Sequence, residues 1–102
     1  MITEVLQNCI QIAIKDKIVN KKIKQLENKK GIRISEIKAK IFDRKREGSL
    51  KSLTIKVGFD FELRIEDKSI KEDIIVKIEY NLDSTTNQEF YEIKDRSMSH
   101  EI

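Results

Sequence analysis

Few side chains in this sequence are of the kinds that catalyse reactions or bind metals. Cys9 is the one cysteine and His100 the one histidine among 102 residues. A zinc site takes about four Cys or His ligands, and a cysteine nucleophile needs an exposed, electropositive setting and a nearby base. Cys9 stands among apolar neighbours and His100 stands near the end of the sequence. We therefore expect a buried structural thiol and a solvated tail histidine.

Three carboxylates offer a second kind of chemistry. Asp60, Glu62 and Glu66 are an even number of residues apart, so they would share one face of a strand. There they could hold a divalent cation or act as acid and base. The same face would carry cations that neutralise them, namely Lys56, Arg64, Lys71 and Lys77. Three glycines are also too few for a glycine-rich phosphate loop. The sequence thus predicts no catalytic, metal or cofactor site, no enzyme and no small-molecule substrate.

The charge is divided unevenly along the chain. Residues 1–51 hold 14 Lys/Arg and 6 Asp/Glu, a balance of +8, and residues 52–102 hold 7 and 12, a balance of −5. One interpretation is a phosphate-binding surface for nucleic acid. Its candidate residues are Arg44, Lys45, Arg46, Lys21, Lys22 and Lys24. The other interpretation is a solvated, lysine-rich face, which the shortage of arginine and of interleaved aromatic residues favours.

The elements that must position these side chains follow from hydrophobic periodicity. From Leu53 to Ile65 every second residue is apolar, which is typical of a long antiparallel strand with one buried face. We predict a helix over 3–30, strands over about 32–43, 50–66, 71–82 and 89–94, and a frayed tail over 95–102. The fold class is α+β: one long N-terminal helix on an antiparallel meander of three to four strands, in one domain and two layers.

Two local irregularities accompany this pattern. The apolar stripe of the helix rotates by about a quarter turn after Asp16 and Lys17, so the helix bends there or its halves face different neighbours. Ile32 and Ile34 are out of phase with Ile37, which a β-bulge near residues 35–36 would correct.

Charge predicts the register of the hairpin formed by strands 50–66 and 71–82. Opposed residue numbers that sum to 137 would join opposite charges across the strands and leave a four-residue loop over 67–70. The expected ion pairs are Glu66 with Lys71, Arg64 with Asp73, and Asp60 with Lys77.

The absence of a signal peptide and of a long apolar run predicts a cytoplasmic protein that does not enter a membrane. Because an open sheet has two unpaired edges, we expect a non-enzymatic protein-binding module that also self-associates. It would be an adaptor, inhibitor or immunity-type protein of the kind that phages and mobile elements often encode. Candidate partner-binding residues are Phe42, Ile75, Val19, Ile23 and Leu26.

A further alternative is a holdase chaperone. The alternating strands around Ile32–Ile41 and Leu53–Ile65 resemble the sheet of SecB-type export chaperones. In that family the principal helices follow the sheet, whereas here the helix precedes it. The resemblance implies binding of unfolded polypeptides.

Overall fold

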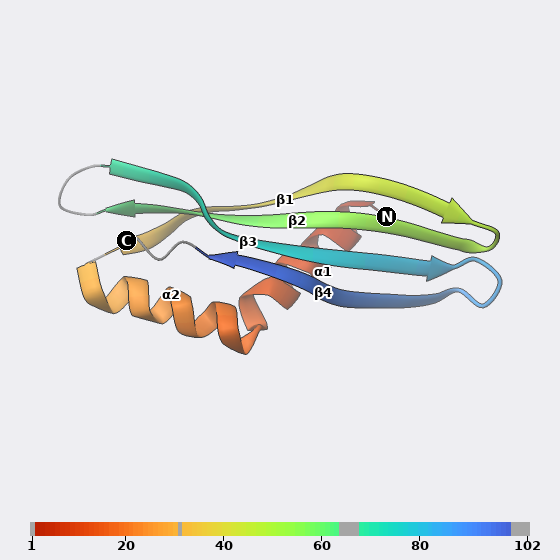
Figure 1. The fold of residues 1–102 in the computed structure, drawn as a ribbon, viewed down its shortest axis with the longest axis horizontal. Coiled ribbons are helices and arrows are strands. Elements are labelled where there is room, and N and C mark those ends of the chain that lie inside the picture. The colour runs from red at the N-terminus through yellow and green to blue at the C-terminus, as the bar shows by residue number, and fades with distance from the viewer. Residues whose placement is uncertain (1, 31, 64–67, 99–102) are drawn as a thin grey trace.

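A computed structural model of the chain describes residues 2–30, 32–63 and 68–98. In these ranges two helices, α1 (Ile2–Lys15) and α2 (Lys17–Lys30), precede four strands. The strands are β1 (Ile32–Glu47), β2 (Leu50–Leu63), β3 (Lys68–Asp83) and β4 (Gln88–Met98), and they form one antiparallel sheet in the order β1-β2-β3-β4 (Figure 1). The predicted α+β class with an antiparallel meander is therefore confirmed. Neither described helix is long and apolar enough to cross a membrane.

The single helix expected over 3–30 is two helices, and Asp16 separates them. Asp16 Oδ2 accepts a hydrogen bond of 3.1 Å from the backbone N–H of Val19, and Asp16 O accepts one of 2.9 Å from the N–H of Asn20. Both are the bonds of a helix N-cap, which Asp forms well because its carboxylate satisfies a free N–H of the first turn. The rotated apolar stripe thus marks a new helix.

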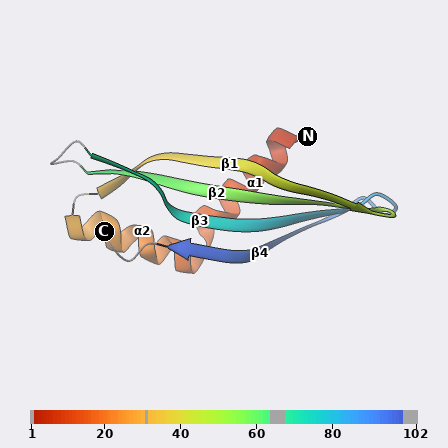
Figure 2. The ribbon, with the colours of Figure 1, turned by 45° about the horizontal axis from the view of Figure 1, so that its top comes forward.

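The core lies between the helices and one face of the sheet. The stripe Val5, Cys9 and Ala13 of α1 and the residues Val19, Ile23 and Leu26 of α2 are buried against it. Alternate residues of the central strands complete it: Ile55, Val57, Phe59, Phe61, Ile74, Val76, Ile78 and Tyr80. The alternation predicted over 53–65 therefore gave the buried face correctly from Ile55 to Phe61, and Ile65 lies outside the described residues. We call the opposite face, which carries no helix, the open face (Figures 1 and 2).

Bulges interrupt the sheet. The β1–β2 register shifts between Ile34 and Glu36, where a bulge was predicted, and again between Ile41 and Asp43. The β3–β4 register shifts between Lys77 and Ile78. In Figure 1 the order of β1, β2 and β3 from top to bottom reverses near the left end, consistent with the extra twist that bulges introduce. β4 runs to Met98, so residues 95–98 are strand and not frayed tail.

The predicted hairpin register is wrong. Lys56 stands opposite Lys77, and Phe59 stands opposite Ile74, so opposed numbers sum to 133 over this stretch. Residues 68–70 of the predicted loop belong to β3, with Lys68 opposite Leu63, whereas Arg64, Glu66 and Asp67 lie outside the described residues. Cross-strand charge pairs contribute only about 0.2–1 kcal/mol each. At the far end of the two strands the same register continues, because Ser84 N–H donates a hydrogen bond of 2.8 Å to Ser49 O.

Candidate functional site: a groove at the end of the helical layer

The helical layer is shorter than the sheet. The molecule measures 52 × 22 × 20 Å, and Figure 1 shows the sheet continuing to the right beyond the first turn of α1. A groove of about 540 Å³ lies at this step, between the start of α1 and the far ends of the strands. We call it the terminal groove. Pockets that hold ligands have volumes of roughly 300–1,000 Å³, so it is large enough to bind part of a partner.

The floor of the terminal groove is apolar. Leu53 and Leu82 from the sheet and Ile2 and Val5 from α1 line it, together with the ring of Tyr80. Leu53 and Tyr80 are cross-strand partners, so their side chains stand on the same face. Leu82 is two residues further along β3, which returns it to that face as well.

Two tyrosines stiffen the floor. The rings of Tyr80 and Tyr91 lie 5.0 Å apart at 49°. Tyr80 donates a hydrogen bond of 2.9 Å to Glu89 Oε2, and Asn8 Nδ2 of α1 donates one of 3.0 Å to the hydroxyl of Tyr91. Burial, helped by Glu89, raises the pKa of Tyr80 to about 12. The hydroxyl therefore remains a neutral donor over the physiological pH range.

The rim of the terminal groove carries charges of both signs. Arg44 of β1 and Lys51 of β2 line one side, and Glu4 of α1 and Glu89 of β4 line the other. Strand order explains the separation, because β1 and β4 are at opposite edges of the sheet. An occupant with a basic group at one end and an acidic group at the other would match this rim.

The structure does not unite the six residues predicted to bind nucleic acid. The bulge at Phe42 reverses the alternation, so Arg44 pairs with Leu53 on the helical side whereas Lys45 pairs with Ser52 on the open face. Lys21, Lys22 and Lys24 belong to α2, at the other end of the molecule from the β1–β2 turn (Figure 1). Arg46 also stands near this turn, and all three residues of 44–46 are exposed.

The candidate partner-binding residues also fall into separate groups, two of them at least partly exposed and three of them buried. Phe42 is 65% exposed, and Ile75 is half-buried on the open face. Val19, Ile23 and Leu26 are at most 6% exposed. These three pack against the chain's own sheet and supply no surface for a partner in this arrangement. The narrow stripe of α2 suggested an external contact because the sheet that covers it could not be placed from sequence.

Among the described side chains, cations of β1 contact two of the strand carboxylates, while Arg64, Glu66 and the side chain of Lys71 lie outside the described part. Lys38 Nζ of β1 lies 3.4 Å from Asp60 Oδ2, and Arg33 of β1 pairs with Glu62. Asp60 itself is only 5% exposed. Within the described ranges no group of three His, Cys, Asp or Glu side chains is placed to hold a metal ion. Cys9 is fully buried, which raises the pKa of its thiol to about 11.

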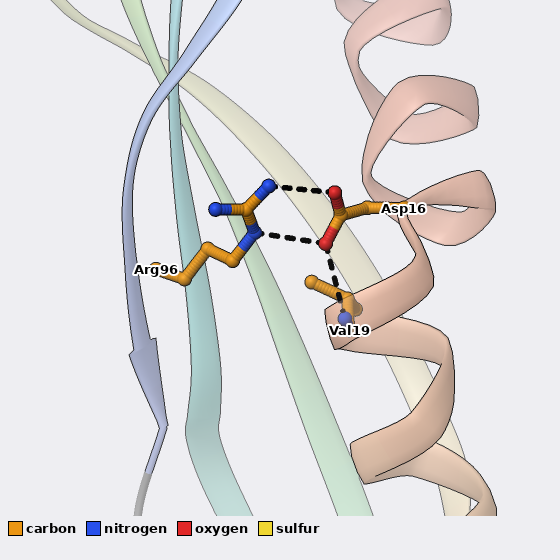
Figure 3. Close-up of polar contacts among 3 residues, drawn as sticks. All are labelled: Asp16, Val19 and Arg96. Carbon is orange, nitrogen blue, oxygen red and sulfur yellow. Dashed lines mark hydrogen bonds and ion pairs between the residues drawn. The ribbon is translucent and has the colours of Figure 1, made fainter.

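The charges at the helix junction form a second polar cluster. Arg96 of β4 donates to both carboxylate oxygens of Asp16, with Nε 2.8 Å from Oδ2 and Nη2 2.7 Å from Oδ1 (Figure 3). This bidentate pair and the N-cap bond to Val19 engage both carboxylate oxygens of Asp16. Its role is therefore structural, since it fixes the start of α2 against the sheet edge.

Sequence reasoning missed the terminal groove. Tyr80 and Leu82 belong to the strand predicted over 71–82, but the position at which α1 stops covering their face of the sheet depends on how the helix is placed over it. Comparison of the chain with protein-family profiles, with curated proteins and with solved structures gave no match.

Proposed function

We propose that this protein is a non-catalytic binding module that holds an apolar segment of a partner polypeptide in the terminal groove. The observation that supports this proposal is a groove of about 540 Å³ with an apolar floor, which lies where the sheet extends beyond the start of α1. The groove lies at the level of the helical layer, where α1 packs on the same face of the sheet. A polypeptide segment can therefore pack against this face as α1 does. Because the rim carries both positive and negative charges, it further favours a segment with apolar residues between a basic and an acidic residue.

The proposal can be tested with a labelled peptide and two matched variants. Ile2 is 46% exposed and lines the groove, whereas Ile18 is 52% exposed and lies on α2. The probe is a fluorescein-labelled peptide of five apolar residues between one Lys and one Glu, followed by fluorescence anisotropy. We expect Ile2→Lys to weaken binding about tenfold or more, because it places a charge on the apolar floor. Ile18→Lys should change the affinity less than twofold.

Two results would overturn the proposal. Equal affinity of the Ile2→Lys and Ile18→Lys proteins would place the peptide elsewhere. No measurable binding of the peptide to the unaltered protein at millimolar concentration would remove the groove as a polypeptide site.

Nucleic-acid binding has less support from the geometry. Lys15, Lys17, Lys21 and Lys24 line a shallow depression on the helices, but Arg44 and Arg46 lie near the β1–β2 turn, at the other end of the molecule. A phosphate backbone that contacts only one of these groups would make few contacts, so we expect weak retention on heparin and a shallow salt dependence.

A further inference from the structure

The open face carries two neighbouring rows of opposite charge. Lys40, Lys56 and Lys77 are successive cross-strand partners on β1, β2 and β3, and we call them the lysine row. The next row on the same face is Asp43, Thr54, Glu79 and Glu92, and we call it the acidic row. Residues two apart on a strand are about 6.6 Å apart, which is the spacing of the rows.

The lysine row breaks a local rule of sheet stability. Like charges directly opposite each other destabilise a pair of strands, and Lys56 stands opposite a lysine on both sides. In the part of the chain that the structure describes, Lys40 and Lys77 form no ion pair within 4.0 Å, and only Asp95 of β4 opposes the row. Places where a sequence departs from such a rule are often functional.

A second copy of this chain would relieve the repulsion. Consider two open faces packed together, with a two-fold axis that lies midway between the sheets and runs parallel to the rows. Each lysine row then covers the acidic row of the other copy. Lys40 faces Asp43 of the second copy, and Lys77 faces Glu79 of the second copy. On β4, Asp95 faces Glu92 of the second copy, and Lys94, which pairs with Glu92 over 3.0 Å, offsets this like-charge contact. Each of these contacts occurs twice, as in every two-fold interface.

Phe42 lies where this axis crosses the edge of the sheet. The bulge between Ile41 and Asp43 places it between the two rows, with Lys56 Nζ 3.7 Å from its ring centroid. The axis would bring the two Phe42 rings together. Phe42, the most exposed large hydrophobic side chain of the described residues, would thereby be buried at an edge of the interface, where β1 is otherwise unprotected.

The open face is large enough for a stable dimer. Four strands about 4.8 Å apart and some 14 residues long cover roughly 900 Å², and a standard interface buries about 800 Å² on each partner. Packed sheets lie about 10 Å apart, a gap that a lysine and a glutamate side chain can close from opposite sides.

We propose that a second copy of this chain docks on the open face through the lysine row, the acidic row and Phe42, in a two-fold dimer that opposite charges hold in register. The dimer leaves both terminal grooves accessible, because they lie on the other side of each sheet. It is therefore independent of the proposed function, and either proposal can fail without the other.

Charge reversal on the two rows tests the dimer. Lys77→Glu places like charges across the axis twice, and so does Glu79→Lys. We expect either variant alone to raise the dissociation constant at least tenfold, measured by sedimentation velocity at low salt. An equimolar mixture of the two variants should dimerise again, because the charge introduced at 77 then faces the opposite charge introduced at 79. Lys21→Glu and Glu27→Lys on α2 make the same changes of net charge away from the interface and should leave the dimer intact.

Other outcomes would overturn the proposal. A monomer at every salt and protein concentration would exclude the dimer. A dimer insensitive to both reversals, or one abolished by Ile2→Lys, would place self-association on another surface. Failure of the mixture to restore association would exclude this two-fold register. Binding of polyphosphate to the lysine row of a monomeric protein would identify an anion as the occupant in place of a second copy.

Discussion

Asp16 shows how a single side chain can divide a helix and tie it to the sheet. The hydrogen bonds from Arg96 and from the backbone of Val19 hold the pKa of its carboxyl below the usual range. A lowered pKa of the Asp16 carboxyl stabilises the fold above about pH 4. This contribution disappears as the pH falls through the lower pKa that the carboxyl has in the folded state. Asp16→Ala should cost about 1–3 kcal/mol of unfolding free energy in urea denaturation.

The pH dependence separates the ion pair from the cap. Asp16→Asn can still accept the hydrogen bond from Val19, but it carries no charge to meet Arg96. Its stability should therefore fall less than that of the unaltered protein between pH 5 and pH 3. Identical pH profiles would contradict a role for the charged pair.

Cys9 is buried on the stripe of α1 that faces the sheet. Because the raised pKa of about 11 leaves little thiolate at pH 8, we expect no reaction with Ellman's reagent in the native protein within an hour and complete reaction in urea. Rapid reaction without denaturant would show that α1 separates from the sheet.

At the scale of elements, hydrophobic periodicity predicted the features that depend on residues close together in the sequence. The alternation over residues 55–61 gave the buried face of β2, and the phase change before Ile37 gave the bulge in β1. The quarter-turn shift at Asp16 was visible, but the sequence pattern did not show whether the helix bends or restarts, and the partner Arg96 is 80 residues away in sequence. The register prediction failed because it was argued from charge alone, and each cross-strand charge pair contributes too little to fix a register. The terminal groove depends on helix placement, which no local pattern encodes.

The observed register predicts which engineered disulfide will form. Ser52 and Asn81 are cross-strand partners whose side chains are already hydrogen-bonded. In a Cys9→Ala background, Ser52→Cys with Asn81→Cys should cross-link under mild oxidation, because directly opposite residues meet the geometry of a disulfide. Ser52→Cys with Thr85→Cys, the pair required by a sum of 137, should remain reduced on mass spectrometry. The reverse result would restore the charge-based register.

At the scale of the whole molecule, a long sheet separates two surfaces of different character. The helical side buries the core and ends in the terminal groove, whereas the open face carries the charged rows. Binding of a polypeptide and docking of a second copy would therefore not compete. We expect peptide affinity per chain to change less than twofold between low and high protein concentration.

The central claim is that the terminal groove binds a polypeptide segment. The most direct measurement is a titration of the isotopically labelled protein with the apolar peptide, followed by two-dimensional amide NMR. We expect the largest changes in chemical shift at the amides of Ile2, Val5, Leu53, Leu82 and Glu89, while the amides of Lys56 and Lys77 on the open face and of the lysines of α2 stay unchanged. Shift changes confined to the open face or to α2, or no shift changes at all, would contradict binding in the terminal groove.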